Sequence, residues 1–242
     1  SEFYRMAQKA GYAPQKVLGF VAGAIILMVA FILMWLLDDS TTVSSQYLII
    51  AVGLALYIMM LIPVMFICEL YRKSPTPIAN IGSTLMGIVY VAMPLALLFF
   101  IPLMLGRGVW NPWALIFYIF IIWANDVCAY LVGMSIGKHR LFQRISPKKS
   151  WEGFIGGLVG AMAMGYVAST FMEGTHAIWI GMALIAAITG VFGDLVESLL
   201  KRSVDVKDSG NILPGHGGWL DRFDALLLSI PFVFIYLVFC ID

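Results

Sequence analysis

The stretch from residue 201 to residue 224, KRSVDVKDSGNILPGHGGWLDRFD, combines the side chains that hold phosphate groups and divalent cations. Four cations alternate with four aspartates, and four glycines lie among them. Carboxylate oxygens bind a hard cation such as Mg²⁺, lysine and arginine neutralise phosphate oxygens, and glycine lets backbone N–H groups approach an anion. This composition predicts a phosphate–magnesium site. A solvated charged loop is the alternative, but such a loop would need neither PGHGG nor so many glycines.

A second group of polar side chains lies in apolar sequence just before this stretch. Its members follow an i, i+3, i+4, i+7 spacing and so share one face of a helix: Asp194, Glu197, Ser198 and Lys201. Asp126, beside Asn125, lies in another apolar segment. Ionisable residues inside the membrane are costly and are functional candidates by default. The alternative is that the carboxylates pair with Lys201 or Arg202 and simply join the helices.

The third group lies in the basic loop at 135–153, SIGKHRLFQRISPKKSWEG. Ser150 is placed to cap the helix that follows, and a helix N-terminus beside Lys148 and Lys149 attracts phosphate. For Lys138, Arg140 and Arg144 the alternative is the general excess of positive charge in cytoplasmic loops. Because the acids lie mainly in the later loop, we expect residues 146–153 to hold the nucleotide and residues 201–224 to hold the metal ion.

The elements that position these residues are membrane-spanning helices. Of the 242 residues 61% are hydrophobic and only 12% are charged, and the mean hydropathy is +0.93. A soluble, disordered or collagen-like chain is excluded by these values, and the net charge of +1 gives no support for a nucleic-acid partner. Since about 20 apolar residues cross a bilayer, we predict an all-α bundle of seven spans in one domain, at 17–37, 47–68, 81–105, 113–134, 154–172, 178–200 and 225–240. Pro94 and Pro102 are expected to kink or split the third.

The basic residues alternate between the two sets of loops. The loops at 1–16, 69–80, 135–153 and 201–224 hold 14 of the 15 lysines and arginines, and the opposite set holds only Arg107. The positive-inside rule therefore predicts that residue 1 and the two long loops face the cytoplasm. Stripes of small residues, Gly156–Gly160 and Gly157–Ala161, are expected to pack helices against each other.

The residues at 198–224 resemble a known family. Ser198-Leu-Leu-Lys-Arg, four residues, and then KDxGxxLPxHGGxxDRxD from Lys207 to Asp224 are similar to the signature of the phosphatidate cytidylyltransferases, also called CDP-diacylglycerol synthases. Residues 125–157 also resemble the upstream nucleotide-site block of that family. The segment EFYRMAQKAGY resembles the part that follows the family's early helices, so we expect the family's N-terminal helices to be missing from this sequence.

The resemblance implies the reaction of CTP with phosphatidate to CDP-diacylglycerol and pyrophosphate, with Mg²⁺, at the cytoplasmic face of a bacterial inner membrane. It implies metal binding by Asp194 and Asp221, which we extend to Asp224, within an active-site part at 125–224. His216 would bind phosphate or shape the glycine-rich turn. The candidate catalytic residues are Lys201, Arg202, Lys207, Asp208, His216 and Arg222. The candidate substrate-binding residues are Asn125, Asp126, Ser146, Lys148, Lys149 and Ser198.

Two other functions are consistent with parts of the sequence. A CTP-dependent polyprenol kinase would have a similar site but would transfer the γ-phosphate and release CDP. An ion-coupled transporter would use Asp126 and Asp194 as coupling sites, but it leaves the phosphate-like loop unexplained. The complete motif at 201–224 favours the cytidylyltransferase. Whether the chain forms a homodimer is left open by the sequence.

Overall fold

The computed structural model describes residues 1–38, 44–172, 175–210 and 217–240. Seven helices in this part of the chain are long and apolar enough to cross a membrane: Lys16–Leu37, Val52–Arg72, Pro77–Leu105, Pro112–Ile136, Trp151–Phe171, His176–Ser203 and Leu220–Cys240. The predicted all-helical membrane fold is confirmed, with helix ends shifted by a few residues, and the chain is an integral membrane protein. Large apolar side chains such as Trp35, Trp123 and Phe171 are exposed, as expected where a helix faces lipid.

The last helix begins at Leu220 rather than at residue 225, where the apolar run starts. The prediction counted only apolar residues, so it left out the polar first turn. That turn carries Asp221, and Asp224 follows it, close to the helix N-terminus where a carboxylate is electrostatically favoured.

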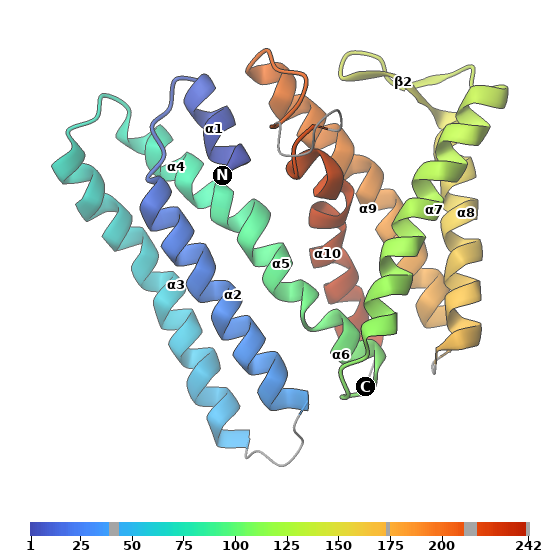
Figure 1. Cartoon of the computed structure of the whole chain (residues 1–242), viewed down its shortest axis with the longest axis horizontal. Coiled ribbons are helices and arrows are strands. Elements are labelled where there is room, and N and C mark those ends of the chain that lie inside the picture. The colour runs from blue at the N-terminus through green and yellow to red at the C-terminus, as the bar shows by residue number, and fades with distance from the viewer. Residues whose placement is uncertain (39–43, 173–174, 211–216, 241–242) are drawn as a thin grey trace. The chain divides into compact units, whose positions relative to one another are not determined.

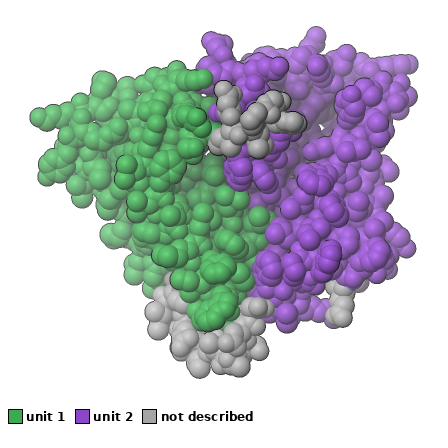
Figure 2. Space-filling model, viewed as in Figure 1, with its two compact units in different colours: residues 1–99 green, residues 100–242 purple. Residues whose placement is uncertain are grey.

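The third span is broken, as its prolines predicted. It consists of helix α4 (Pro77–Gly87), a π-helical stretch η1 (Ile88–Ala92), α5 (Met93–Leu98) and α6 (Ile101–Leu105). A proline has no N–H group, so the helical bonds from residue 94 to residue 90 and from residue 102 to residue 98 cannot form. The chain divides into two compact units close to the second break, Ser1–Phe99 and Phe100–Asp242, which Figure 2 shows in two colours.

Unit 1 contains α1 (Glu2–Lys9), α2 (Lys16–Asp38), α3 (Ser44–Arg72), α4, η1 and α5. The ring of Tyr4 lies against Gly19 and Gly87, where any Cβ atom would overlap it, and its hydroxyl donates to the Thr84 carbonyl at 3.0 Å. Burial raises the pKa of Tyr4 to about 12, so the phenol remains a neutral donor. This side chain fixes the short polar helix α1 on the apolar helices of its unit.

A buried polar cluster joins three other elements of unit 1. The Glu69 carboxylate at the end of α3 accepts hydrogen bonds from Gln15 (2.7 Å) and Asn80 (2.6 Å) and pairs with Arg72 at 2.8 Å. A buried charge is tolerated when it is paired and hydrogen-bonded in this way. The cluster therefore fixes the start of α2 and the start of α4 against the end of α3.

Unit 2 contains α6, α7 (Pro112–Ile136), the antiparallel strands β1 (Arg140–Phe142) and β2 (Ser146–Ser150), α8 (Trp151–Phe171), α9 (His176–Ser203) and α10 (Leu220–Cys240). Helix α7 packs along α8, and α9 packs along both α8 and α10. Trp179, Tyr118 and Leu227 are fully buried in this core, where the Tyr118 hydroxyl lies 2.7 Å from the Ser229 hydroxyl. Figure 1 shows the hairpin at the same end of unit 2 as the end of α9 and the start of α10.

The expected packing of small residues is confirmed at the contact between α7 and α8. An added Cβ atom at Gly156 would overlap Val132, one at Gly157 would overlap Asn125, and one at Gly160 would overlap Cys128. The small residues thus let the two helices approach closely, as they do in many membrane helix pairs. This contact sets the position of Asp126 and of the start of α8, which both belong to the site described next.

Candidate active site

A cavity of about 600 Å³ lies at the hairpin end of unit 2. Side chains from α7, the hairpin, the start of α8 and the middle of α9 surround it. Its polar lining carries charges of both signs, and Tyr130, Met134 and Phe154 add apolar walls. The charged and hydroxyl residues of the lining are Asp126, Arg140, Lys148, Lys149, Ser150 and Asp194. A cavity of this size with a few polar groups is typical of a small-molecule site.

The hairpin is fixed to the first turn of α8. The Ser150 hydroxyl accepts a hydrogen bond from the Gly153 N–H at 3.1 Å, so the predicted helix cap is confirmed. The backbone N–H of Trp151 donates to the His139 carbonyl at 2.9 Å, and the Glu152 carboxylate lies 2.6 Å from His139 Nδ1. These bonds hold both ends of the hairpin at the base of α8, with Lys148 and Lys149 at the cavity.

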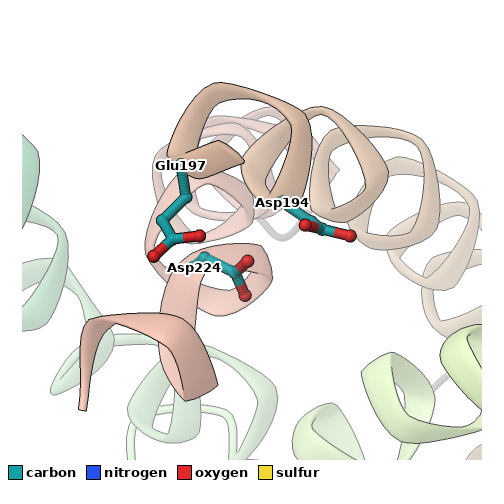
Figure 3. Close-up of side chains that lie close together, drawn as sticks. All are labelled: Asp194, Glu197 and Asp224. Carbon is teal, nitrogen blue, oxygen red and sulfur yellow. The ribbon is translucent and has the colours of Figure 1, made fainter. Parts of the chain in front are cut away.

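Three carboxylates gather where α9 faces α10. Asp194, Glu197 and Asp224 each offer an oxygen, and these oxygens lie within 4.8 Å of one another. Figure 3 shows Asp194 and Glu197 extending from one helix and Asp224 from the other. An added Cβ atom at Gly193 would overlap the Asp224 backbone, so this glycine allows the helices to come close enough. We call these three residues the carboxylate trio; oxygen ligands of this kind suit a hard divalent cation.

Lys149 connects the hairpin to the carboxylate trio. Its Nζ atom lies 2.6 Å from Asp194 Oδ2 and donates to the Val191 carbonyl at 3.3 Å. The other oxygen of Asp194 accepts from the Ser198 hydroxyl at 3.2 Å. The two loops that the sequence treats as separate, one for the nucleotide and one for the metal ion, therefore meet at Asp194.

Lys201 connects the trio to the start of α10. Its Nζ atom lies 2.5 Å from Glu197 and 2.7 Å from Asp221, and only 15% of its side chain is exposed. Asp221 also accepts from the Ser209 N–H and hydroxyl, both at 2.9 Å, and from the Gly218 N–H at 2.7 Å. Asp221 lies outside the carboxylate trio but contacts Glu197 both directly and through this lysine.

Gly217 has a backbone φ of +83°, which L side chains rarely adopt. A Cβ atom there would lie 2.8 Å from an oxygen of Asp221 and 3.7 Å from an oxygen of Asp208. The glycine therefore leaves room for the Asp221 carboxylate, and the Asp208 carboxylate lies near the same side of Gly217. Its neighbour His216, a candidate in the sequence, lies outside the described residues.

The remaining predicted residues neither belong to the trio nor line the cavity. Asn125 is buried against Gly157 and donates to Asp126 at 3.4 Å, so it contacts a cavity residue without lining the cavity. Ser146 begins β2 and is not among the lining residues. The exposed residues of the group are Arg202, Lys207, Asp208 and Arg222.

Two residues at the site are missing from the final candidate residues of the sequence analysis. Arg140 lines the cavity from β1, although its charge had the positive-inside rule as an alternative explanation. The hairpin that places it has no glycine or asparagine turn to signal it. Glu197 belongs to the trio, and its i+3 spacing from Asp194 put it on the right helix face, but only the position of α10 shows the shared group.

Comparison with known proteins identifies the family of this chain. Residues 1–240 match the cytidylyltransferase family. The phosphatidate cytidylyltransferase of Staphylococcus aureus (strain COL) is 48% identical over 120 residues, which are 49% of this chain and 46% of that protein. The one of Bacillus subtilis (strain 168) is 49% identical over 120 residues, 48% of this chain and 44% of that protein. The match thus spans less than half the length of these relatives. Because the family match runs almost from end to end, the chain belongs to the cytidylyltransferase family.

Proposed function

We propose that this chain binds CTP and phosphatidate and forms CDP-diacylglycerol and pyrophosphate. The observation that carries this proposal is the Lys149–Asp194 pair, which joins a basic hairpin, a cavity of about 600 Å³ and a carboxylate trio. The printed names of the similar proteins support the same reaction. An oxygen of the phosphatidate phosphate attacks the α-phosphorus of CTP, and the bond between the α-phosphorus and the bridging oxygen breaks to release pyrophosphate.

The residues at the site suit the electrostatic difficulty of this reaction. The attacking phosphate is already an anion at neutral pH, so the reaction needs no strong general base. Its difficulty is that one anion must approach another, and fixed cations near the developing charge reduce that repulsion. Lys148, Lys149 and Arg140 at the cavity are placed to bind the triphosphate, while Lys201 lies deeper, beside Glu197 and Asp221.

We also propose that the carboxylate trio holds Mg²⁺. Three carboxylate oxygens within 4.8 Å of one another match the ligands this ion prefers, and two of the three residues are buried. When bound, the ion supplies positive charge that offsets the triphosphate. Asp221, predicted from the sequence as a ligand, instead orients Lys201 and the turn at Gly217 in this proposal; it would join the ion only if Lys201 moved away.

The proposed location is a bacterial inner membrane with the site facing the cytoplasm. The relatives are bacterial, and within unit 2 the basic hairpin lies at the same end as the basic last turn of α9. CTP is a polar cytoplasmic nucleotide, whereas phosphatidate keeps its phosphate at the leaflet surface. A cavity at one end of the unit 2 helices serves both substrates.

The decisive experiment uses CTP labelled at either the α- or the γ-phosphate. Purified protein in lipid nanodiscs is given phosphatidate, a polyprenol and Mg²⁺, and lipid and aqueous products are separated. We expect the α-label in the lipid and the γ-label in pyrophosphate. Transfer of the γ-label to a lipid alcohol with release of CDP would instead identify a kinase, and absence of label from the lipid would overturn the proposal.

A matched pair of variants tests the assigned residues in the same assay. Asp194→Asn keeps the shape of the side chain but removes a charge from the trio, so we expect product formation to fall at least about 100-fold. Asp205→Asn removes the same charge from an exposed position in the neighbouring loop, with a φ of +52° that asparagine tolerates. That variant should retain near-normal activity.

A further inference from the structure

Lys149 is held by a residue that the proposed metal ion also needs. Its ammonium group lies 2.6 Å from Asp194 Oδ2, and Asp194 is a member of the carboxylate trio. A Mg²⁺ ion binds a carboxylate oxygen at about 2.1 Å. Two positive charges on one carboxylate repel each other at such short range, although the Asp194 side chain is 41% exposed and solvent weakens the repulsion. The ammonium group and the ion therefore compete for Asp194.

The Lys149 side chain has room to move from Asp194 toward the cavity. It belongs to strand β2, lines the cavity, and has a side chain that is 24% exposed on a flexible four-carbon stem. Lys201 has no such freedom, because it is only 15% exposed and is held by both Glu197 and Asp221. The cavity that Lys149 lines is the one proposed to hold the triphosphate.

We propose that Lys149 is an exchangeable counter-ion that links metal binding to nucleotide binding. Lys149 and a divalent cation compete for Asp194, and the cation releases Lys149 to the nucleotide phosphates. Each of the two ligands then favours the other, because each takes one partner of the Lys149–Asp194 pair. Lys149 is thus a positioning residue for both ligands. The competition for Asp194 stands on geometry alone, while the nucleotide step rests on the proposed function.

The first test titrates the purified protein with Mn²⁺ alone, as a probe for the divalent cation, by calorimetry. Lys149→Met removes the competitor, so we expect Mn²⁺ to bind about four- to fivefold more tightly than to the unchanged protein. Lys149→Arg keeps the charge and should bind Mn²⁺ like the unchanged protein. A residue with a merely structural role would weaken Mn²⁺ binding when replaced, not strengthen it.

Lys148→Met is the matched control. Lys148 is the neighbouring residue, lines the same cavity and carries the same charge, but its side chain forms no ion pair within the described part of the chain. We expect it to change Mn²⁺ affinity less than about twofold. Equal strengthening in both variants, or none in Lys149→Met, would overturn the competition.

Two further variants separate this inference from the metal site itself. Asp194→Asn should weaken Mn²⁺ binding, and adding Lys149→Met to it should have no further effect, because the negative charge for which the two cations compete is gone. If Asp194→Asn binds Mn²⁺ like the unchanged protein, the ion does not use the trio and the proposed metal site fails. If Asp194→Asn weakens Mn²⁺ binding but adding Lys149→Met to it still strengthens that binding, the metal site stands and the competition at Asp194 fails.

The second test measures CTP binding without phosphatidate, once in EDTA and once in saturating Mg²⁺. In EDTA Asp194 retains Lys149, so Lys149→Met should weaken CTP binding only slightly. In Mg²⁺ the lysine is released, and the same variant should weaken CTP binding about fivefold more than in EDTA. Chelation of Mg²⁺ by CTP affects the variant and the unchanged protein equally, so it cancels when their CTP affinities are compared under one condition. An equal loss under both conditions would show that the lysine is not exchanged.

Discussion

Lys201 is the most enclosed cation at the site, and its surroundings explain why its loss would be costly. It lies between Glu197, whose side chain is fully buried, and Asp221, whose side chain is 11% exposed. Removal of one partner from a buried ion pair typically costs about 3–5 kcal/mol, because the other charge stays buried without compensation. The two carboxylates would then share one small region with no cation between them.

We therefore expect Lys201→Met to lower the melting temperature, and to lower it more in EDTA than in Mg²⁺. A divalent cation at the trio would supply positive charge beside Glu197 in place of the missing lysine. Thermal unfolding of the purified protein in detergent measures both values. Arg202→Met, an exposed neighbour with the same charge, is the control and should change neither. A loss of stability that Mg²⁺ leaves unchanged would argue against metal binding next to Lys201.

Gly217 offers a second prediction at the scale of one residue. Alanine at this position would meet an oxygen of Asp221 at 2.8 Å in addition to the strain of its positive φ. We expect Gly217→Ala to reduce CDP-diacylglycerol formation at least about tenfold, because the carboxylate that holds Lys201 must shift.

The control for Gly217 is Gly108, which has a φ of +88° and no atom within 4 Å of an added Cβ. Gly108→Ala imposes the same backbone strain of roughly 1–2 kcal/mol without the overlap. Its rate should therefore stay near normal while its melting temperature falls slightly. Similar rates in the two variants would show that the space at Gly217 has no part in the reaction.

Among the elements, the hairpin has the least support from its own sequence. It is short, its strands carry several exposed residues, and it depends on bonds to the first turn of α8. Glu152 provides two of these: both of its carboxylate oxygens lie 3.2 Å from the His139 N–H, and one lies 2.6 Å from the His139 ring. The hairpin in turn positions three cavity cations, so its attachment should control nucleotide binding rather than folding.

Glu152→Ala should therefore raise the KM for CTP several-fold and leave kcat close to normal. The side chain that is lost lies near the surface, so the melting temperature should change little. Arg144→Gln changes another charged residue of the hairpin, one that is exposed and lies away from α8, and serves as the control. Steady-state assays over a range of CTP concentrations check both. A fall in kcat without a rise in KM would mean that the hairpin acts on the chemical step.

The helices could be predicted from the sequence, and the hairpin could not. Long apolar runs and two prolines are local signals, and they led to seven spans and to the broken third one. The cap at Ser150 is equally local. The hairpin at 140–150 has no turn residue that marks it, and its stability comes from α8. The grouping of Asp194 and Glu197 with Asp224 depends on how α9 meets α10, which helix periodicity alone cannot give.

At the scale of the whole molecule, the distribution of charge makes a prediction about orientation. The hairpin, the end of α9 and the start of α10 lie at one end of unit 2, as expected when α7, α8, α9 and α10 alternate in direction (Figure 1). The short connection between α6 and α7, which carries Arg107, is separated from that end by the length of α7. The loops at 135–153 and 201–224 hold nine of the 15 lysines and arginines, which predicts that their end faces the cytoplasm.

Single cysteines test this orientation in a background that lacks Cys68, Cys128 and Cys240. Arg144 and Lys207 are exposed at the hairpin end, and Val109 is 65% exposed in the connection between α6 and α7. A thiol reagent that cannot cross the membrane should label Val109→Cys in intact cells, because that connection is predicted to face outward. It should label Arg144→Cys and Lys207→Cys only after the inner face is opened, since the proposed substrate CTP would have to reach the cavity from that side. Labelling of Arg144→Cys or Lys207→Cys in intact cells would reverse the orientation, and a cytoplasmic source of CTP could then no longer reach the site.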